Sequence, residues 1–428
     1  MSGEAKLDDI WLAAGVRTPF AKVDGGLSKL DVFGLSVPVV QAMMAQLGGK
    51  KPDFLTWGSV APDLGFSNLA REICVEAGID LTIPSFTTIL ACSTSMVSVF
   101  SAAGMLDGRG RELALIGGVE SMSHVQVGLG HRLSNWLRHM LQARSLGDRV
   151  RLLGHLKFGD VRLDIPSVQN RATHKSMGEH TEEMAKTWGI PREEQDAVAL
   201  ASHQGAVRGW NEGFFDDLVI PVGGVARDLI PRADTTLEKL GKLKPAFDKT
   251  SGRGTLTAGN SSPLTDGAAA IWVATRKGLE RLPAGVPRVR LVDWDVGAID
   301  LWHEGLLMWP AYGIPRLLAR NGLTLGDVDL WEIHEAFAAQ VLCHIKALED
   351  RDFVRQKAGV ETDLGRFPRE RMNPNGGSTA LGHPFGATGA RILSQAVKEL
   401  AVRPAGSRAV VSICADGGQG TIALLEAG

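Results

Sequence analysis

Residues 87–96 read TTILACSTSM, and this stretch decides the fold class because it joins an apolar run to a helix through a cysteine. The apolar residues before the cysteine predict a strand over 86–91, and the residues after it predict a helix over 95–106. A further apolar run predicts a strand over 112–117. The cysteine, Cys92, would then lie at a helix N-terminus, where the helix dipole lowers a thiol pKa and a sharp turn exposes the side chain. A small buried core residue also suits this position, and spacing alone favours neither interpretation.

The C-terminal part of the chain repeats this order of elements. Residues 372–418 predict a glycine-rich turn, a helix over 386–400, a strand over 409–413 and then a second cysteine, Cys414. This repeat indicates two similar halves with a pseudo-twofold relation. Further strands are predicted at 9–15, 54–59, 289–294, 330–333 and 420–425, and further helices at 67–76, 192–212, 312–321 and 336–347. The alternation is typical of an α/β fold in which helices cover the sheets.

Three segments place chemically active side chains beside turns. In NPNGGSTALGHPFGATG, His383 lies on a rigid glycine-rich turn and could act as the base for a nearby thiol. In WEIHEAFA, His334 lies where a predicted strand becomes a helix, although a single histidine there is more often structural. In SICADGGQG, Cys414 ends a strand before a glycine turn that can present backbone N–H groups to an anion.

The composition excludes several classes of protein. The chain of 428 residues has 46 Lys plus Arg and 48 Asp plus Glu, so no basic excess indicates a nucleic-acid partner. Its length favours two or three domains. Four widely spaced cysteines, Cys74, Cys92, Cys343 and Cys414, match neither a disulfide scaffold nor a zinc motif, so we expect no metal. The first residues lack the pattern of a secretory signal and no apolar run reaches about 18 residues, so we expect a cytoplasmic protein.

The region from about residue 125 to residue 260 interrupts the repeat and is predicted to be an insertion carried by one half. Residues 131–157 form an amphipathic basic segment, whose apolar side chains recur at helical spacing. These side chains are Leu133, Trp136, Leu137, Met140 and Leu141, and around them lie Arg132, Arg138, Arg144, Arg149 and Arg151. A charged, solvated face on a packing helix is the plainer interpretation. The alternatives are a cover for phosphates or an acyl chain, a partner helix, or a contact with a membrane surface.

Taken together, the segments around Cys92, His334, His383 and Cys414 resemble the motifs of the thiolase family. The family has a nucleophile segment like ACSTS, an [N/H]EAFA box, a GHPxGx[ST]G[AC]R box and a C-terminal CxxGGxG, and all four occur here in that order. Shorter matches lie between them: RTPF at 17–20, GGVESMS at 117–123, SMG at 176–178 and TAGNSS at 257–262. The resemblance spans nearly the whole chain.

The resemblance implies the thiolase fold, in which two similar βαβαβ-type halves form α-β-α-β-α layers and one half carries a loop domain. The N-terminal half would comprise residues 1–123 and 263–286. The loop domain, a cover for coenzyme A, would comprise residues 124–262, and the C-terminal half residues 287–428.

The resemblance also implies a mechanism. Cys92 would take the acyl group, His383 would accept its proton, and Cys414 would move the proton at the α-carbon of acetyl-CoA. His334 would orient a water in an oxyanion hole for the enolate, with His383 as the other donor. A second oxyanion hole would use the backbone N–H groups of Cys92 and Asp416.

The same resemblance implies substrates and partners. Coenzyme A and acyl-CoA would be substrates and no prosthetic group would be needed. Met177 and Ser262 match family positions near the pantetheine. The chain is expected to form a homodimer or homotetramer, and an α-subunit of a β-oxidation complex is a further expected partner.

Two departures from the family pattern bear on the activity. The family usually has Gly or Ala where this chain has Asp416, and a carboxylate near a developing enolate is unfavourable unless it is paired or points away. His334 replaces the Asn of the commonest biosynthetic members, and with the long basic stretch it resembles degradative thiolases. We therefore expect thiolytic cleavage of medium- or long-chain 3-ketoacyl-CoA in fatty-acid β-oxidation.

Three other functions are alternatives. The first alternative is a biosynthetic acetoacetyl-CoA thiolase, and the second is a catalytically silent thiolase-fold protein that binds lipid or coenzyme A. A ketoacyl-synthase-like enzyme would use one cysteine with two histidines, and Cys414 argues against it.

Overall fold

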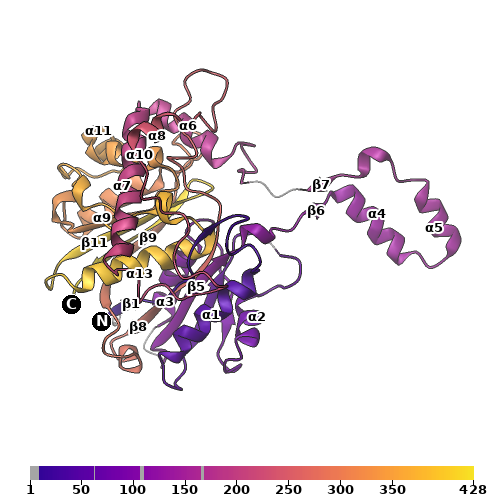
Figure 1. Cartoon of the computed structure of the whole chain (residues 1–428), viewed down its shortest axis with the longest axis horizontal. Coiled ribbons are helices and arrows are strands. Elements are labelled where there is room, and N and C mark those ends of the chain that lie inside the picture. Colours follow the sequence, from indigo (N-terminus) through magenta and orange to yellow (C-terminus); the bar gives the residue numbers. More distant parts are fainter. Residues whose placement is uncertain (1–8, 62, 107–109, 165–167) are drawn as a thin grey trace, which may run out of the picture.

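The computed structural model describes residues 9–61, 63–106, 110–164 and 168–428 (Figure 1). Among these residues, ten strands form one mixed sheet in the order β10-β11-β12-β9-β1-β8-β5-β3-β4, with β2 beside β8, and β6 pairs with β7 separately. The strands are β1 (Ile10–Ala13), β2 (Ala21–Lys22), β3 (Phe54–Gly58), β4 (Ser85–Phe86), β5 (Leu113–Glu120), β6 (Gly128–Leu129), β7 (Leu163–Asp164), β8 (Thr265–Thr275), β9 (Arg288–Ala298), β10 (Leu330–Ile333), β11 (Arg408–Ala415) and β12 (Gln419–Glu426).

The helices are α1 (Val32–Ala45), α2 (Leu69–Glu76), α3 (Thr94–Met105), α4 (His131–Gln142), α5 (Leu146–Leu153), α6 (Met177–Thr187), α7 (Arg192–Asn211), α8 (Leu237–Gly241), α9 (Trp309–Arg320), α10 (Ala338–Glu349), α11 (Arg351–Gln356), α12 (Ser378–Leu381) and α13 (Thr388–Ala401). None of the described helices is long and apolar enough to cross a membrane.

The strand pairing confirms the predicted repeat. In the N-terminal half β3 is parallel to β5, and the ladder continues antiparallel through β8 to β1. In the C-terminal half β10 is parallel to β11, and the ladder continues antiparallel through β12 to β9. The first strands of the two halves, β1 and β9, pair antiparallel at the centre. The halves therefore have the same topology and meet at their equivalent strands.

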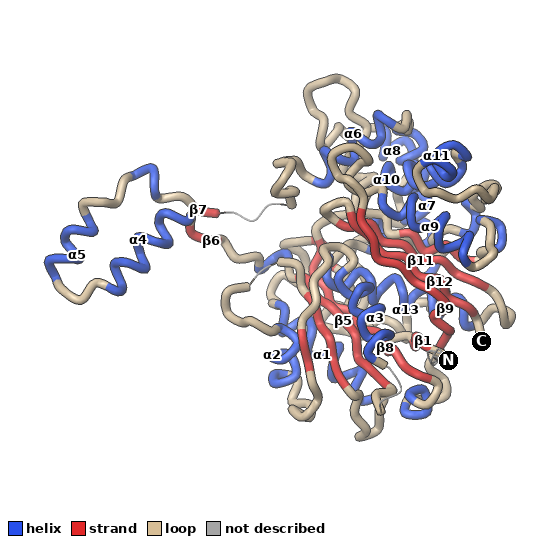
Figure 2. Tube along the Cα trace, turned by 180° about the vertical axis from the view of Figure 1, so that it is seen from behind, coloured by secondary structure: helices blue, strands red, loops and turns tan. Residues whose placement is uncertain are grey.

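Alternating side chains on the strands produce five layers. On β5, Ala114 and Ile116 face a central core, whereas Leu113 and Leu115 face a second core under α1 and α2. The central core also takes side chains from α3, α13 and the C-terminal strands β11 and β12. A third core lies between the C-terminal strands and the helices α9 and α10 (Figure 2). The central helices α3 and α13 are thus buried between the two halves of the sheet, which gives the predicted α-β-α-β-α order.

Among the elements that differ from the sequence-based predictions, three have a clear physical reason. The predicted strand 86–91 is wrong beyond Phe86, where the hydroxyl groups that follow bond to neighbouring helices: Thr87 accepts from the Ala70 amide of α2 and Thr88 pairs with Ser98 of α3. The long strand β8 was not predicted, because its run of alanines favours a helix on propensity alone. Helix α1 was not predicted, because it contains Gly34 and Pro38.

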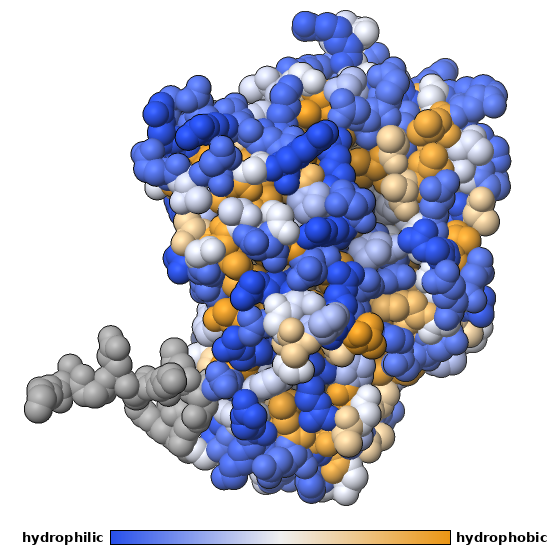
Figure 3. Space-filling model, turned by 90° about the vertical axis from the view of Figure 1, so that its left-hand side faces the viewer, coloured by the Kyte–Doolittle hydropathy of each residue, from blue (hydrophilic) through white to orange (hydrophobic). Residues whose placement is uncertain are grey.

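The insertion between β5 and β8 contains a projecting arm. The short ribbon of β6 and β7 carries α4 and α5 away from the body of the protein (Figure 1). The expected amphipathic helix is present, but it packs on α5 rather than on the body: Trp136 Nε1 donates to the Leu152 carbonyl at 2.8 Å, and neither helix has a buried residue. By contrast, the face of the molecule opposite the arm is mostly hydrophilic with scattered apolar side chains (Figure 3). The boundaries predicted for the loop domain stay a prediction.

Candidate active site

Cys92 lies on a tight turn between β4 and α3. Ala91 has a positive φ of 43°, an unusual conformation for a residue with a Cβ atom, and α3 begins two residues after Cys92. The turn is tied to the C-terminal half, because Ser93 Oγ donates to the Ile413 carbonyl at 3.3 Å and accepts from Thr421 Oγ1 at 3.0 Å. The thiol is therefore presented by a turn that both halves of the molecule hold in place.

His383 lies on the glycine-rich turn between α12 and α13. Its backbone N–H donates to Thr265 Oγ1 at 3.0 Å, and its Nδ1 lies 2.6 Å from Thr388 Oγ1. Thr388 Oγ1 in turn donates to the Pro384 carbonyl at 3.0 Å. Because the Thr388 proton is already used, His383 Nδ1 carries the hydrogen and donates to Thr388, and its Nε2 is left as an acceptor.

His334 follows β10 directly. Its backbone N–H continues the ladder by donating to the Ser412 carbonyl at 2.9 Å, so the ring leaves the end of the strand next to β11. His334 Nδ1 lies 2.8 Å from Ser378 Oγ. The side chain is fully buried.

Cys414 and Asp416 come from the end of β11 and the turn after it. Cys414 is 1% exposed. Asp416 Oδ1 accepts from Asn170 Nδ2 of the insertion and from the Gly417 amide, both at 2.7 Å. Two neutral hydrogen-bond donors therefore hold this carboxylate in place.

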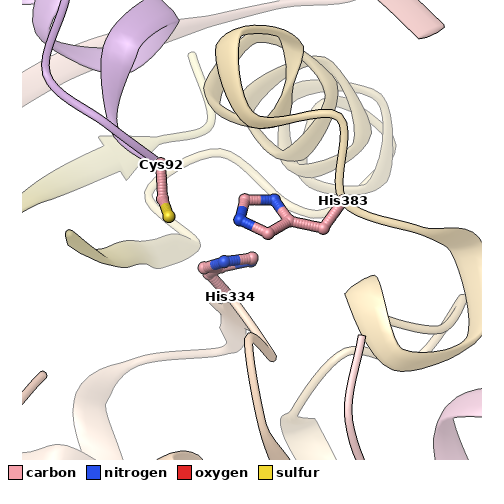
Figure 4. A group of neighbouring side chains, drawn as sticks. All are labelled: Cys92, His334 and His383. Atoms are coloured by element: carbon pink, nitrogen blue, oxygen red, sulfur yellow. The ribbon is translucent and has the colours of Figure 1, made fainter. Parts of the chain in front are cut away.

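Three of these side chains converge on one point (Figure 4). The ligand atoms of Cys92, His334 and His383 all lie within 4.8 Å of one another, and the two imidazole centroids are 4.2 Å apart. Such a set of sulfur and nitrogen atoms could also hold a metal ion. Each histidine Nε2 is buried and has no hydrogen-bond partner among the described residues, so both are available to a reacting group.

Burial controls the protonation of this cluster. Burial lowers the pKa of His383 to about 3, and the charge of Arg391 acts in the same direction. Burial raises the pKa of Cys92 to about 12, and the Asp416 carboxylate raises it further. The pKa of Cys414 is likewise raised by burial and by Cys92, and the pKa of His334 is lowered by burial and by His383. The predicted lowering of the Cys92 pKa by the helix dipole is therefore wrong, because desolvation outweighs it. Neutral thiols face neutral imidazoles.

A pocket of about 640 Å³ opens onto the cluster. Cys92, His383, Cys414 and Asp416 line its inner end, and Met177 and Ser262, the two predicted coenzyme contacts, also line it. Most of the remaining lining side chains are apolar: Val60, Ala61, Ala91, Met122, Val125, Val168, Pro263, Leu264, Leu307, Ala336, Phe337 and Phe385. A mostly apolar pocket lined by two thiols and the His383 imidazole suits a thioester with an apolar chain.

Several supporting residues were not found from the sequence. Thr388 and Ser378 fix the two histidine rings. Glu120, fully buried, accepts from Ser59 Oγ and from three amides, those of Val60, Ala61 and Gly386, so it ties the end of β3 to the turn of His383. These residues stand in or beside quoted motifs, but no spacing pattern in the sequence shows which partners they meet.

A thiol beside two imidazoles next to a largely apolar pocket suits an enzyme that transfers acyl groups, and the comparisons with known proteins point to the same class. The thiolase N-terminal domain model matches residues 10–277 and the thiolase C-terminal domain model matches residues 286–427. A 3-ketoacyl-CoA thiolase of Yersinia enterocolitica is 36% identical over 98% of this chain and 97% of its own, and one of Yersinia pestis is 36% identical over the same shares.

Solved structures agree as well. The acetyl-CoA acetyltransferase of Bacillus anthracis is 31% identical, with a TM-score of 0.79 and 99% of each chain covered. The acetyl-CoA acetyltransferase of Syntrophomonas wolfei is 28% identical, with a TM-score of 0.80, and covers 98% of this chain and 99% of its own. The chain belongs to the thiolase family and is an acyltransferase.

Proposed function

We propose that this enzyme cleaves 3-ketoacyl-CoA with coenzyme A, through an acyl group on Cys92, to acetyl-CoA and a shortened acyl-CoA. The observation that carries the proposal is the meeting of Cys92, His334 and His383 beside a largely apolar pocket that Cys92, His383 and Cys414 line. The names of the Yersinia relatives support the same reaction.

In the proposed reaction, protons move stepwise between neutral thiols and the neutral His383 imidazole. The Cys92 thiol gives its proton to His383 Nε2 as its sulfur attacks the C3 carbonyl of the substrate. The C2–C3 bond then breaks, and the enolate of acetyl-CoA takes a proton from Cys414. Coenzyme A next gives its thiol proton to the Cys414 thiolate as its sulfur attacks the acyl group on Cys92, and the departing Cys92 thiolate takes its proton back from His383, so both cysteines are regenerated. The reverse sequence is a Claisen condensation.

Each charged intermediate needs a donor. His334 and His383 serve the enolate, and the backbone N–H groups of Cys92 and Asp416 serve the tetrahedral oxyanion. The carboxylate of Asp416 is paired with Asn170, which reduces its repulsion of that oxyanion. Met177 and Ser262 contact the pantetheine of coenzyme A, and no prosthetic group takes part.

The assignment of the degradative reaction depends on the length of the acyl chain that the pocket accepts. The apolar lining of the pocket favours medium or long acyl chains, whereas a biosynthetic acetoacetyl-CoA thiolase handles only the shortest. Thiolysis rates should be measured with 3-ketoacyl-CoAs of four to sixteen carbons, with Cys92→Ala as the inactive control. We expect kcat/KM to rise with chain length. A maximum at acetoacetyl-CoA would overturn the degradative assignment, and turnover by Cys92→Ala would overturn the reaction itself.

The enzyme works as a homodimer or homotetramer. The edge strand β4 lies at the end of the sheet beside the Cys92 turn, where Ile89 is 61% exposed. Unpaired sheet edges of this kind commonly join subunits. Light scattering of the purified chain tests the assembly, and a monomer at micromolar concentration would contradict it. An α-subunit of a β-oxidation complex remains a predicted partner.

The arm contacts an anionic membrane surface. Its exposed apolar side chains, among them Leu146, Val150 and Phe158, lie among the basic residues of 131–157. Such a combination favours an anionic lipid interface. Sedimentation with phosphatidylglycerol vesicles should pull down the protein, whereas phosphatidylcholine vesicles and the variant Leu146→Asp/Val150→Asp should not. Equal sedimentation with both lipids would exclude the contact.

A further inference from the structure

We propose that Ser378 is a positioning residue that holds His334 in the tautomer with its hydrogen on Nε2, so that His334 presents a hydrogen-bond donor to the catalytic cluster. The proposal rests on the proposed function, in which His334 serves the enolate. It goes beyond that function by naming the residue that fixes the ring.

The three side chains of this relay come from neighbouring elements of the C-terminal half. Arg391 of α13 donates from a terminal guanidinium nitrogen to Ser378 Oγ of α12 at 2.6 Å, and Ser378 Oγ lies 2.8 Å from His334 Nδ1. The relative exposures of Arg391, Ser378 and His334 are 2%, 0% and 0%. Water therefore does not compete for these hydrogen bonds.

The direction of the hydrogen bonds follows from counting protons. A guanidinium only donates, so Ser378 Oγ accepts from Arg391. The Ser378 hydroxyl has one proton of its own, and His334 Nδ1 is its remaining neighbour. If Nδ1 carried the ring hydrogen, both neighbours would donate to Ser378 and the hydroxyl proton would be buried without an acceptor, at a cost of about 1–3 kcal/mol. Ser378 therefore donates to Nδ1, and the hydrogen of His334 lies on Nε2.

The neighbouring charge keeps this ring neutral. The positive charge of Arg391 lies one hydroxyl away, and the pKa of His334 is lowered by burial, by His383 and by Arg391. A neutral ring with a single fixed N–H is a pre-organised donor, because it needs no reorientation when the enolate forms.

The two histidines then have opposite tautomers. The Thr388 hydroxyl donates to the Pro384 carbonyl and accepts from His383 Nδ1, so His383 Nε2 is an acceptor. The Ser378 hydroxyl donates to His334 Nδ1, so His334 Nε2 is a donor. Both Nε2 atoms are buried and have no partner among the described residues. The two rings lie next to the Cys92 sulfur (Figure 4). The two rings therefore present one proton acceptor and one proton donor side by side, and the Thr388 and Ser378 hydroxyl groups determine which ring has which role.

Ring-nitrogen NMR of the full chain tests the tautomer directly. In protein labelled with ¹⁵N-histidine, the His334 signals are assigned by their loss in His334→Asn. We expect a protonated Nε2 and a bare Nδ1 in the wild type, and a mixture of tautomers in Ser378→Ala. A protonated Nδ1 in the wild type, or an unchanged tautomer in Ser378→Ala, would overturn the proposal.

Kinetics separate positioning from simple stability. Ser378→Ala should lower kcat for thiolysis about ten- to hundredfold with KM changed less than twofold, and should still be acetylated on Cys92. Ser378→Thr, which restores the hydroxyl, should recover most of kcat. Ser394→Ala is the matched control, because Ser394 is a buried serine in α13 that bonds to the Gly15 amide and the Ala270 carbonyl. A loss of kcat in Ser394→Ala equal to that in Ser378→Ala would refute the positioning role.

The outcomes also distinguish this proposal from the proposed function. If wild-type Cys92 is not acetylated, the proposed function fails, whereas the NMR result still decides the tautomer. If Cys92 is acetylated and Ser378→Ala turns over at the wild-type rate, only the role of Ser378 fails.

Discussion

The protonation of Cys92 leads to a prediction about its reactivity. Burial, with the Asp416 carboxylate as the second cause, raises the thiol pKa from 9.0 to about 12. At pH 8 the thiolate fraction is then about one in ten thousand, roughly a thousandfold less than for a thiol of pKa 9. Alkylation requires the thiolate, so Cys92 should react slowly and without a plateau as the pH rises.

The variant Asp416→Asn isolates the contribution of charge. An asparagine oxygen can still accept from Asn170 and from the Gly417 amide, so the turn keeps its hydrogen bonds while the negative charge is lost. We expect the alkylation rate of Cys92 at pH 8 to rise severalfold, but by less than a thousandfold, because the larger effect of burial remains.

The assay is the iodoacetamide rate at Cys92 from pH 6 to pH 10, read by peptide mass spectrometry in a Cys414→Ala background. Asp300→Asn is the control, since Asp300 is an exposed acid that does not line the pocket. A plateau below pH 8 would show a stabilised thiolate and refute the reasoning. So would an Asp416→Asn variant that reacts more slowly than its background.

Three further predictions concern catalysis and stability. Cys414→Ala should form the acetyl adduct on Cys92 but lose thiolysis by at least a hundredfold in a coupled assay; normal turnover would exclude the proton-transfer role. Burial lowers the pKa of His344 to about 4, so between pH 6.5 and pH 4 only the unfolded chain takes up a proton at this residue. The free energy of unfolding, measured with urea, should therefore fall from pH 6.5 towards pH 4 by up to about 1.4 kcal/mol per pH unit for this group. The variant His344→Gln should show a shallower fall. Glu120→Ala leaves three amides and a hydroxyl without their acceptor, so it should lower the free energy of unfolding by about 3 kcal/mol or more, whereas an unchanged urea midpoint would contradict its bridging role.

Apolar runs were sufficient to predict most of the sheet. The strands β3, β5, β10, β11 and β12 are buried runs bounded by turn residues, and their order with the intervening helices indicated the repeat. Local pattern failed where packing overrides propensity. The alanines of β8 form a strand because β5 and β1 pair with it on either side and Phe20 fills the space above its Gly267.

The candidate site shows the same limit. Motifs identified Cys92 and His383, because each stands in an unusual turn sequence. They could not show that Thr388 and Ser378 give the two rings opposite tautomers, because that depends on atoms brought together by folding. The pKa of Cys92 was predicted in the wrong direction for a related reason: the helix dipole can be read from the sequence, whereas the degree of desolvation depends on the packing of both halves.

The acyl carrier is the central claim, and intact-mass spectrometry after incubation with acetyl-CoA tests it most directly. The wild-type chain should gain one acetyl group, located on Cys92 and removed by added coenzyme A, and Cys92→Ser should gain no thioester. An adduct of equal amount and equal sensitivity to coenzyme A in Cys92→Ser would contradict the assignment.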